Sequence, residues 1–243
     1  MPINPWPQPA AIAERAARAL ARLRRGRMLH PAGRSFAGEV LVWGTSGPPT
    51  GVRLLDQPGR YPAVVRISKG TPTPGGWPDV LGLAVRIHRP TGPPFDLLVS
   101  SSAAAPGLRH LPLPRRRFTG TYSSIMSYRT GRRRLWLAAL ADPASPDLGH
   151  DLAGLSTAAA DRPGLVLAAA SAAGPWRPFG QVTLGDQLSA RDDATLAFDP
   201  VGNVPEELRL AGPLAWLRRH TYRGSRRGRG VSAQSGGSTG LTV

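Results

Sequence analysis

The C-terminal segment 218–229, RRHTYRGSRRGR, combines one tyrosine with six arginines. If it is helical, at about 100° per residue, Arg218, Tyr222 and Arg229 fall within about 40° of one another on one face. A guanidinium one turn from a phenol stabilises the phenolate. A phenolate binds ferric iron strongly, and tyrosinate is one of the axial ligands that proteins give to haem. The same residues also fit a basic amphipathic helix with an incidental tyrosine, which the segment taken alone favours.

Two further stretches carry groups that could do chemistry. His30 lies in RMLHPAG, between a helical and a strand-like segment. Its unperturbed pKa lies near neutrality, so it could act as an acid or base, although an isolated histidine is more often a surface or capping residue. Arg66 and Ser68 lie in RIS, upstream of DVLGLAVR and FDLLVSSS. Taken singly, these stretches are typical of barrel strands, with Arg66 as a solvated charge.

Strand-like segments rich in branched residues surround these motifs. Each is bounded by clusters of Gly, Pro or Asp, which is typical of strands joined by loops. Consecutive strands without helices between them favour an α+β domain with an antiparallel sheet or barrel over a doubly wound fold. The predicted strands are 38–43, 61–67, 82–87, 95–100, 165–169, 179–184 and 194–198.

Helices are predicted at both ends and in the middle of the chain. Apolar residues recur at helical spacing over 10–27, after a proline-rich arm. The block 123–142 is expected to be helical with an interruption at Gly131, and 142–154 to be a loop into a further helical stretch. The segment 212–229 has proline in its first turn and is predicted to be the last helix.

These elements divide the chain into three parts. We predict an N-terminal arm and helix over 1–26, one barrel domain over 27–230 and a flexible tail over 231–243. The N-terminus lacks the pattern of a secretory signal, and the most apolar run, 165–173, is shorter than the roughly 20 residues of a membrane span. We therefore expect a cytoplasmic protein without a membrane span.

The charge of the chain is strongly basic. It has 31 basic and 15 acidic residues, a net charge of +16, and Lys69 is the only lysine. So many arginines attract anions, whether nucleic acid, an acidic membrane surface or the carboxylates of a ligand. The chain has no cysteine, which excludes disulfides, thiolate metal sites and cysteine nucleophiles.

Taken in order, the motifs resemble those of the haem catalases and their small catalase-related relatives. The chain carries Arg-x-x-His-x-x-Gly, Arg-hydrophobic-Ser, Asp-x-x-Gly-hydrophobic-Ala-hydrophobic-basic, aromatic-Asp-Leu and Arg-x-x-x-Tyr. They lie at 27–33, 66–68, 79–86, 95–97 and 218–222, in the order of the family. The resemblance implies an antiparallel catalase-like β-barrel with flanking helices around one haem b, as a minimal barrel without the further segments of a full catalase.

The resemblance also implies a role for each site residue. His30 would be the distal acid/base residue, and the hydroxyl of Ser68 would bond to its ring and fix its tautomer. Tyr222 would be the axial phenolate ligand of the iron, kept ionised by Arg218. The haem propionates would pair with arginines, whose forks bind carboxylates bidentately. These arginines are Arg27, Arg66 and Arg229.

One position departs from the family. The family has an asparagine after the aromatic-Asp-Leu motif, where it helps to hold peroxide over the iron, and this chain has Ser100 or Ser101 there. A serine hydroxyl reaches less far than a carboxamide, and a misplacement of about an ångström can cost about a hundredfold in rate. We therefore expect peroxidase-like reaction with hydrogen peroxide or an organic hydroperoxide rather than fast dismutation.

Two alternatives to this enzyme stay open. One is a haem-binding protein with little catalysis, for storage, sensing or scavenging. The other is a haem-free barrel whose arginine clusters bind nucleic acid or acidic lipid. This second alternative is the less favoured one, and nucleic acid is not the expected partner, because the clusters lie tens of residues apart and lack interleaved aromatic residues. Assembly of the chain into homo-oligomers is also left open.

Overall fold

The computed structural model describes residues 32–71 and 73–211. The N-terminal arm, the predicted helices at 10–27 and 212–229 and the C-terminal tail lie outside these ranges. So do five of the predicted site residues, namely Arg27, His30, Arg218, Tyr222 and Arg229.

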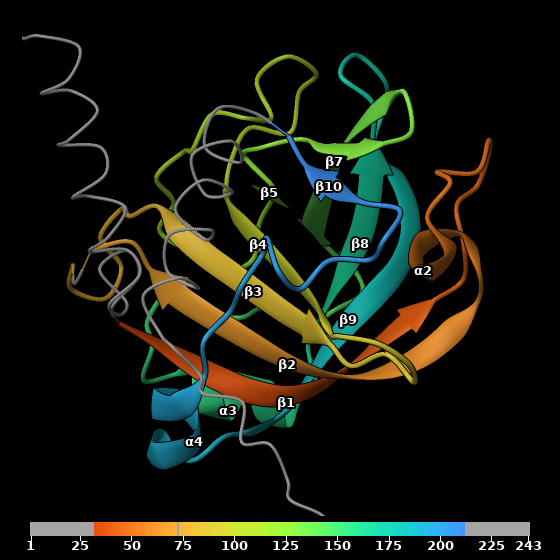
Figure 1. Ribbon diagram of the computed structural model, residues 1–243. Coiled ribbons are helices and arrows are strands. Elements are labelled where there is room, and N and C mark those ends of the chain that lie inside the picture. The colour runs from red at the N-terminus through yellow and green to blue at the C-terminus, as the bar shows by residue number, and fades with distance from the viewer. Residues whose placement is uncertain (1–31, 72, 212–243) are drawn as a thin grey trace, which may run out of the picture.

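Antiparallel strands make up most of the regular secondary structure of the described chain (Figure 1). Three short helices, α2 (Arg53–Asp56), α3 (Leu155–Ala160) and α4 (Ala190–Thr195), lie between them. The strands are β1 (Ala32–Val42), β2 (Gly59–Lys69), β3 (Leu81–Ile87), β4 (Phe95–Ser101), β5 (Tyr122–Ser123), β6 (Tyr128–Thr130), β7 (Arg133–Ala141), β8 (Gly164–Ala170), β9 (Arg177–Gln187) and β10 (Arg209–Leu210).

Eight of the strands close into a barrel. They follow the order β7-β5-β4-β3-β2-β1-β9-β8, and β8 pairs back with β7 to complete the ring. Every pairing is antiparallel. β6 and β10 extend the sheet beyond the start of β7, at the upper end of the barrel in Figure 1. Because the sheet closes on itself, each of the eight barrel strands pairs with a neighbour on both sides over at least part of its length.

The barrel interior is the hydrophobic core. Phe36, Val65, Val85 and Leu97 are cross-strand partners on β1 to β4, and all of them are buried in one core cluster. Successive side chains of a strand point to opposite faces. The alternate residues of these four strands, which include the predicted site residues Arg66, Ser68 and Ser100, therefore lie on the outer face of the barrel.

The antiparallel barrel confirms the predicted fold class. β1, β2, β3, β4, β8 and β9 confirm six of the seven predicted strands, each extended by a few residues at one or both ends. The helical stretch expected after the 142–154 loop is present as α3.

The prediction of a helix over 123–142 is wrong, because most of this block forms a β-hairpin. β6 and β7 pair antiparallel, and Gly131 between them has a φ of 55°, a conformation that suits glycine in a tight hairpin turn. β7 then pairs with β5 and β8 and closes the barrel. Burial inside a closed sheet thus outweighs the local helix propensity of the leucines and alanines.

The predicted strand at 194–198 is also wrong, because α4 ends there. Ser189 caps this helix: its hydroxyl accepts a hydrogen bond from the Asp192 backbone N–H at 3.1 Å and donates to the Asp192 carboxylate at 2.7 Å. Ser189 is therefore the N-cap residue of α4, and the aspartates of the first turn lie at the positive end of the helix. The chain after α4 crosses the outside of the barrel towards β10 (Figure 1).

Candidate functional site

A row of small residues crosses the outer face of β1 to β4. The strand register places Gly33 opposite Ser68, Ser68 opposite Gly82, and Gly82 opposite Ser100. Gly33, Ser68 and Gly82 come from three different motifs of the sequence, and Ser100 follows a fourth. Pairing therefore brings the motifs together side by side, and the row itself carries only small side chains.

Arg66 lies beside this row and over Gly33. A Cβ atom on Gly33 would come within 2.7 Å of the Arg66 guanidinium, so only glycine leaves room for the arginine in this position. The Nε of Arg66 donates to the carboxylate of Asp193 on α4 at 3.3 Å. The hydroxyl of Ser35 donates to the same carboxylate. The predicted contact of Arg66 with a haem propionate stays a prediction.

Ser68 is buried, and its hydroxyl donates to the carbonyl of Gly82 at 3.3 Å. A hydroxyl has one hydrogen and two lone pairs. With its hydrogen directed at Gly82, the Ser68 oxygen can accept a hydrogen bond from an N–H group. This is the bond that would fix the tautomer of an imidazole, as the resemblance implies for His30.

The structure distinguishes Ser100 from Ser101. Ser101 is fully buried; its hydroxyl accepts from the Leu81 backbone N–H at 2.9 Å and donates to the Leu113 carbonyl at 2.7 Å. Ser100 is partly exposed and belongs to the outer row. Of the two serines, Ser100 is therefore the one whose side chain is available on the outer row.

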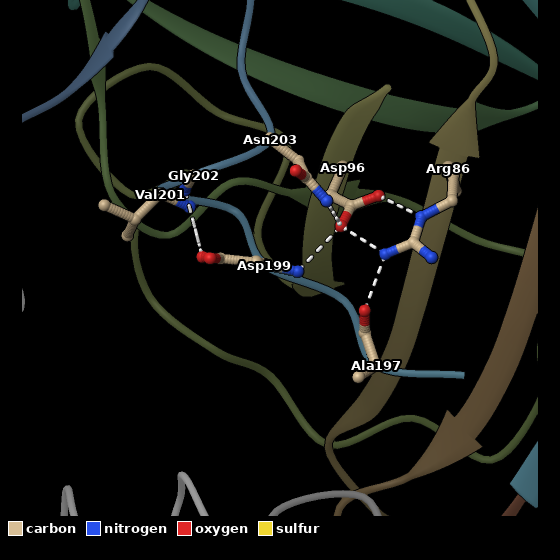
Figure 2. A network of polar contacts seen from close by, with 7 residues as sticks. All are labelled: Arg86, Asp96, Ala197, Asp199, Val201, Gly202 and Asn203. Carbon is tan, nitrogen blue, oxygen red and sulfur yellow. Dashed lines mark hydrogen bonds and ion pairs between the residues drawn. The ribbon is translucent and has the colours of Figure 1, made fainter. Parts of the chain in front are cut away.

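A second polar cluster lies on the same outer face, at the other end of β3 and β4 (Figure 2). Arg86 binds Asp96 bidentately, with Nε to Oδ1 and Nη2 to Oδ2 both at 2.7 Å. The fully buried Asp96 also accepts from the Asp199 backbone N–H at 2.7 Å and from the Asn203 side chain at 2.8 Å. Its hydrogen bond to Arg86, stronger than the opposing desolvation, raises the pKa of that guanidinium.

This cluster fastens the chain after α4 to the barrel. Arg86 donates to the Ala197 carbonyl at 2.6 Å and stacks 5.0 Å from the ring centroid of Phe198. The aspartate of the aromatic-Asp-Leu motif, Asp96, is therefore a structural anchor. Asp79, from the preceding motif, is likewise structural, because its carboxylate accepts hydrogen bonds from Thr71 and Thr73 in the β2–β3 loop.

Of the predicted site residues, the described structure brings Ser68 and Ser100 into one row, with Arg66 alongside. Sequence reasoning missed Asp193 and Ser35, which hold Arg66. Asp193 lies 127 residues from Arg66, and no motif at that position indicated the contact.

Tyr122 of the described chain is not a candidate phenolate ligand. Burial raises the pKa of Tyr122 far above its ordinary value, and its hydroxyl donates to the Phe118 carbonyl at 2.6 Å, so this phenol stays neutral. Within 32–71 and 73–211, no group of three or more His, Asp or Glu residues could hold a metal ion.

No helix in the same ranges is long and apolar enough to cross a membrane.

Solved catalase structures share this fold. A fungal catalase superposes with a TM-score of 0.58 at 13% sequence identity, over 86% of this chain and 61% of the catalase. A bacterial catalase superposes with a TM-score of 0.56, also at 13% identity, over 91% of this chain and 61% of the catalase. The chain thus spans less than two thirds of the length of these catalases.

No protein-family model and no curated protein sequence matches the chain. The likeness therefore concerns the three-dimensional fold, at an identity too low to carry over activity. The described chain is a closed, eight-stranded antiparallel barrel with a catalase-like fold.

Proposed function

We propose that the protein binds haem b and acts on hydrogen peroxide or an organic hydroperoxide. The observation that carries this proposal is the outer row of Gly33, Ser68, Gly82 and Ser100 on a catalase-like barrel. Motifs that resemble the haem catalases in sequence order thereby meet on one face in space.

The outer row fits a flat cofactor. Its two glycines and two serines carry little or no side chain, so a planar macrocycle can approach the backbone of the sheet closely. Gly33 further lets the Arg66 guanidinium lie down along the wall. When bound there, haem would supply a redox-active iron at which the O–O bond of a peroxide is cleaved.

The residues that would hold haem in this proposal lie mostly outside the described ranges. Tyr222 would ligate the iron as a phenolate, since Arg218 one turn away favours the ionised form. Arg27, Arg66 and Arg229 would pair with the propionates. These roles rest on the resemblance of their motifs.

His30 would move the proton of the substrate. As a base it takes the proton from one peroxide oxygen, and as an acid it returns that proton to the leaving oxygen. Ser68 would orient the imidazole by accepting its N–H, using the lone pairs left when its own hydrogen points to Gly82. Ser100 would donate to the peroxide, with the shorter reach of a hydroxyl.

The short reach of Ser100 decides between catalase and peroxidase activity in this proposal. Dismutation at high turnover needs peroxide held closely in line with the acid/base group, and a loosely held substrate reacts more slowly. We therefore propose peroxidase-like reduction of hydroperoxides, with weak catalase activity.

Hemin titration of the purified full-length chain tests the proposal. We expect one hemin per chain and an absorption spectrum between about 300 and 700 nm that is typical of ferric tyrosinate haem. Tyr222→Phe should lose or grossly alter this spectrum, whereas His30→Ala should keep it and lose the reaction with peroxide. A chain that stays colourless after hemin addition would overturn the haem proposal and leave the haem-free barrel.

The rate of hydrogen peroxide consumption by the hemin-loaded chain separates an enzyme from a passive haem binder. A chain that takes up one hemin but consumes hydrogen peroxide no faster than its His30→Ala variant is a storage, sensing or scavenging protein. A Tyr222→Phe variant with an unchanged spectrum would show that the axial ligand is another residue.

A further inference from the structure

The strands β10, β6 and the start of β7 form a small sheet with two unlike faces. The register pairs Leu210 with Tyr128 and Tyr128 with Leu135, and all three side chains are buried. Tyr128 packs edge-on against Phe95 of the barrel, with the ring centroids 6.3 Å apart. One face of this sheet is therefore fixed to the core.

The opposite face carries a row of arginines. The neighbouring register pairs Arg209 with Arg129 and Arg129 with Arg134, and all three are exposed. We call Arg129, Arg134 and Arg209 the arginine row. Arg132 adds a further exposed charge at the turn of the β6–β7 hairpin.

This arrangement is unfavourable for the isolated protein. Like charges directly opposite each other on a sheet repel and destabilise the pairing. Among the described residues, no carboxylate forms an ion pair with any member of the row. The exposed Glu206 and Glu207 precede β10 in the sequence, but neither forms an ion pair with Arg209.

The arginines at 115–117 show the contrasting case. Arg115 donates to the Ser102 carbonyl at 3.0 Å, Arg116 donates to the Gly76 carbonyl at 2.9 Å, and Arg117 pairs with Asp147. The fold uses these side chains to fasten loops together. Within 32–71 and 73–211 no hydrogen bond or ion pair engages the side chains of the arginine row in this way, which leaves the row available for an anion from outside.

We propose that the arginine row is a sequence-independent contact site for the phosphate backbone of nucleic acid. Guanidinium forks bind phosphates bidentately. Two inter-strand steps make the row about 10 Å long, and duplex DNA carries about six phosphate charges over that length. A sheet held by the core presents the three forks at fixed spacing, which suits a repeating polyanion.

The surroundings of the row favour nucleic acid over an acidic membrane. Proteins that lie on membranes through basic surfaces usually insert apolar side chains beside the charges. The large exposed apolar residues of the described chain lie on other strands and loops. They are Leu41, Trp43, Trp77, Leu108, Leu111 and Leu113. Among the described residues, the aromatic side chain beside the row is Trp136, on the same face of β7 as Arg134, and it is only partly exposed. We therefore expect contact mainly with phosphates.

Fluorescence anisotropy with a labelled 20-base-pair duplex of arbitrary sequence, between about 50 and 200 mM salt, tests the proposal on the full-length chain. The row variant carries Arg129→Gln, Arg134→Gln and Arg209→Gln. Its matched control loses the same charge at exposed arginines elsewhere, through Arg53→Gln, Arg177→Gln and Arg191→Gln. We expect the slope of log K against log salt to become shallower by about 1 per arginine in the row variant, but to stay near the wild-type value in the control.

Equal slopes for the row variant and the control would overturn the proposal, as would a wild-type chain that does not bind the duplex at 50 mM salt. Vesicles containing phosphatidylserine form the competing arm. If the row variant loses binding to vesicles but binds the duplex as the wild type does, the partner is a membrane and the proposal is wrong.

Two further measurements keep the test decisive. Because the row repels itself, the row variant should unfold at the same or a higher urea concentration than the wild type at low salt. If the triple variant does not fold, Arg129→Gln alone, set against Arg177→Gln, should still lower the slope by about 1. Hemin uptake should be unchanged in both variants, so the haem proposal and this one can fail separately.

Discussion

Two arginine–aspartate pairs fasten the chain after β9 to the outer face of the barrel. They differ in the hydrogen bonds that join the two side chains and in the burial of the carboxylate. Arg86 and Asp96 meet through two hydrogen bonds of 2.7 Å, and the carboxylate is fully buried. Arg66 and Asp193 meet through one contact of 3.3 Å, and the Asp193 side chain is 17% exposed.

The difference separates structure from function on one surface. Asp96 accepts hydrogen bonds from three residues, and these contacts hold the 197–203 segment in place. The Arg66 pair is looser and borders the row of Gly33, Ser68 and Ser100. Two arginine–aspartate pairs on one face can therefore serve as a fixed anchor at one end of the sheet and border a candidate ligand site at the other.

Asp96→Ala should have the largest effect, because it breaks the tight pair and leaves the Arg86 charge without its carboxylate. Removing one partner of such a buried pair costs about 3–5 kcal/mol. Urea unfolding of the full-length chain measures the loss. Asp186→Ala, at an exposed position on β9, is the matched control and should change the stability by less than about 0.5 kcal/mol. A loss below 1 kcal/mol for Asp96→Ala would show that the two pairs do not differ as described.

Ser100→Asn tests the end of the sheet near Arg66, where the candidate site lies. A carboxamide reaches further than the serine hydroxyl and should hold peroxide better, so we expect peroxide consumption per bound haem to rise by up to about a hundredfold, or about 2.7 kcal/mol of barrier. Oxygen release from hydrogen peroxide measures the rate.

Ser101→Asn is the control for that substitution. The Ser101 hydroxyl already bridges Leu81 and Leu113 in a buried position, so the larger side chain should destabilise the barrel without raising the rate. If Ser101→Asn raises peroxide consumption and Ser100→Asn does not, the assignment of the outer row is wrong.

Gly33→Ala should disturb the Arg66 end alone. The added methyl group would lie 2.7 Å from the guanidinium, so Arg66 must move away from Asp193. We expect a loss of about 1 kcal/mol in urea unfolding, since only one charge-assisted hydrogen bond is weakened. Gly154→Ala is the matched control, because its Cβ would meet atoms no closer than 3.5 Å. Equal stability for the two variants would show that Gly33 is not needed to seat Arg66.

The barrel could be predicted from the sequence where strand signals are local. Branched residues bounded by Gly and Pro placed β1 to β4, β8 and β9 correctly, because each pattern depends only on neighbouring residues. β7 could not be recognised in this way. Its leucines and alanines suit a helix, and only its pairing with β5 and β8 makes it a strand.

The sequence predicts those residues of the candidate site that lie in or directly after the motifs. The order of the motifs indicated Arg66, Ser68 and one of two serines, and strand register was needed to choose Ser100. Asp193 could not be found, since its contact with Arg66 depends on how α4 packs against the barrel. The different use of individual arginines is likewise a tertiary property. The clusters 115–117 and 132–134 look alike in sequence, but in the second one Arg133 donates to the Pro49 carbonyl at 3.0 Å whereas Arg134 belongs to the arginine row.

Asp193→Ala should have the smallest effect and tests whether Gly33, Arg66 and Asp193 act as one unit. Alone, it should cost about 1 kcal/mol, since it removes the 3.3 Å contact with Arg66 and the hydrogen bond from the Ser35 hydroxyl, at a carboxylate that is partly exposed. Combined with Gly33→Ala, it should add less than it costs alone, because the first change has already displaced the arginine and the Ser35 hydrogen bond is what the second change still removes. Urea unfolding of the four proteins of this cycle measures the coupling. Full additivity would mean that Gly33 and Asp193 act on Arg66 independently, and the looser pair would then be a second anchor rather than the border of the candidate site.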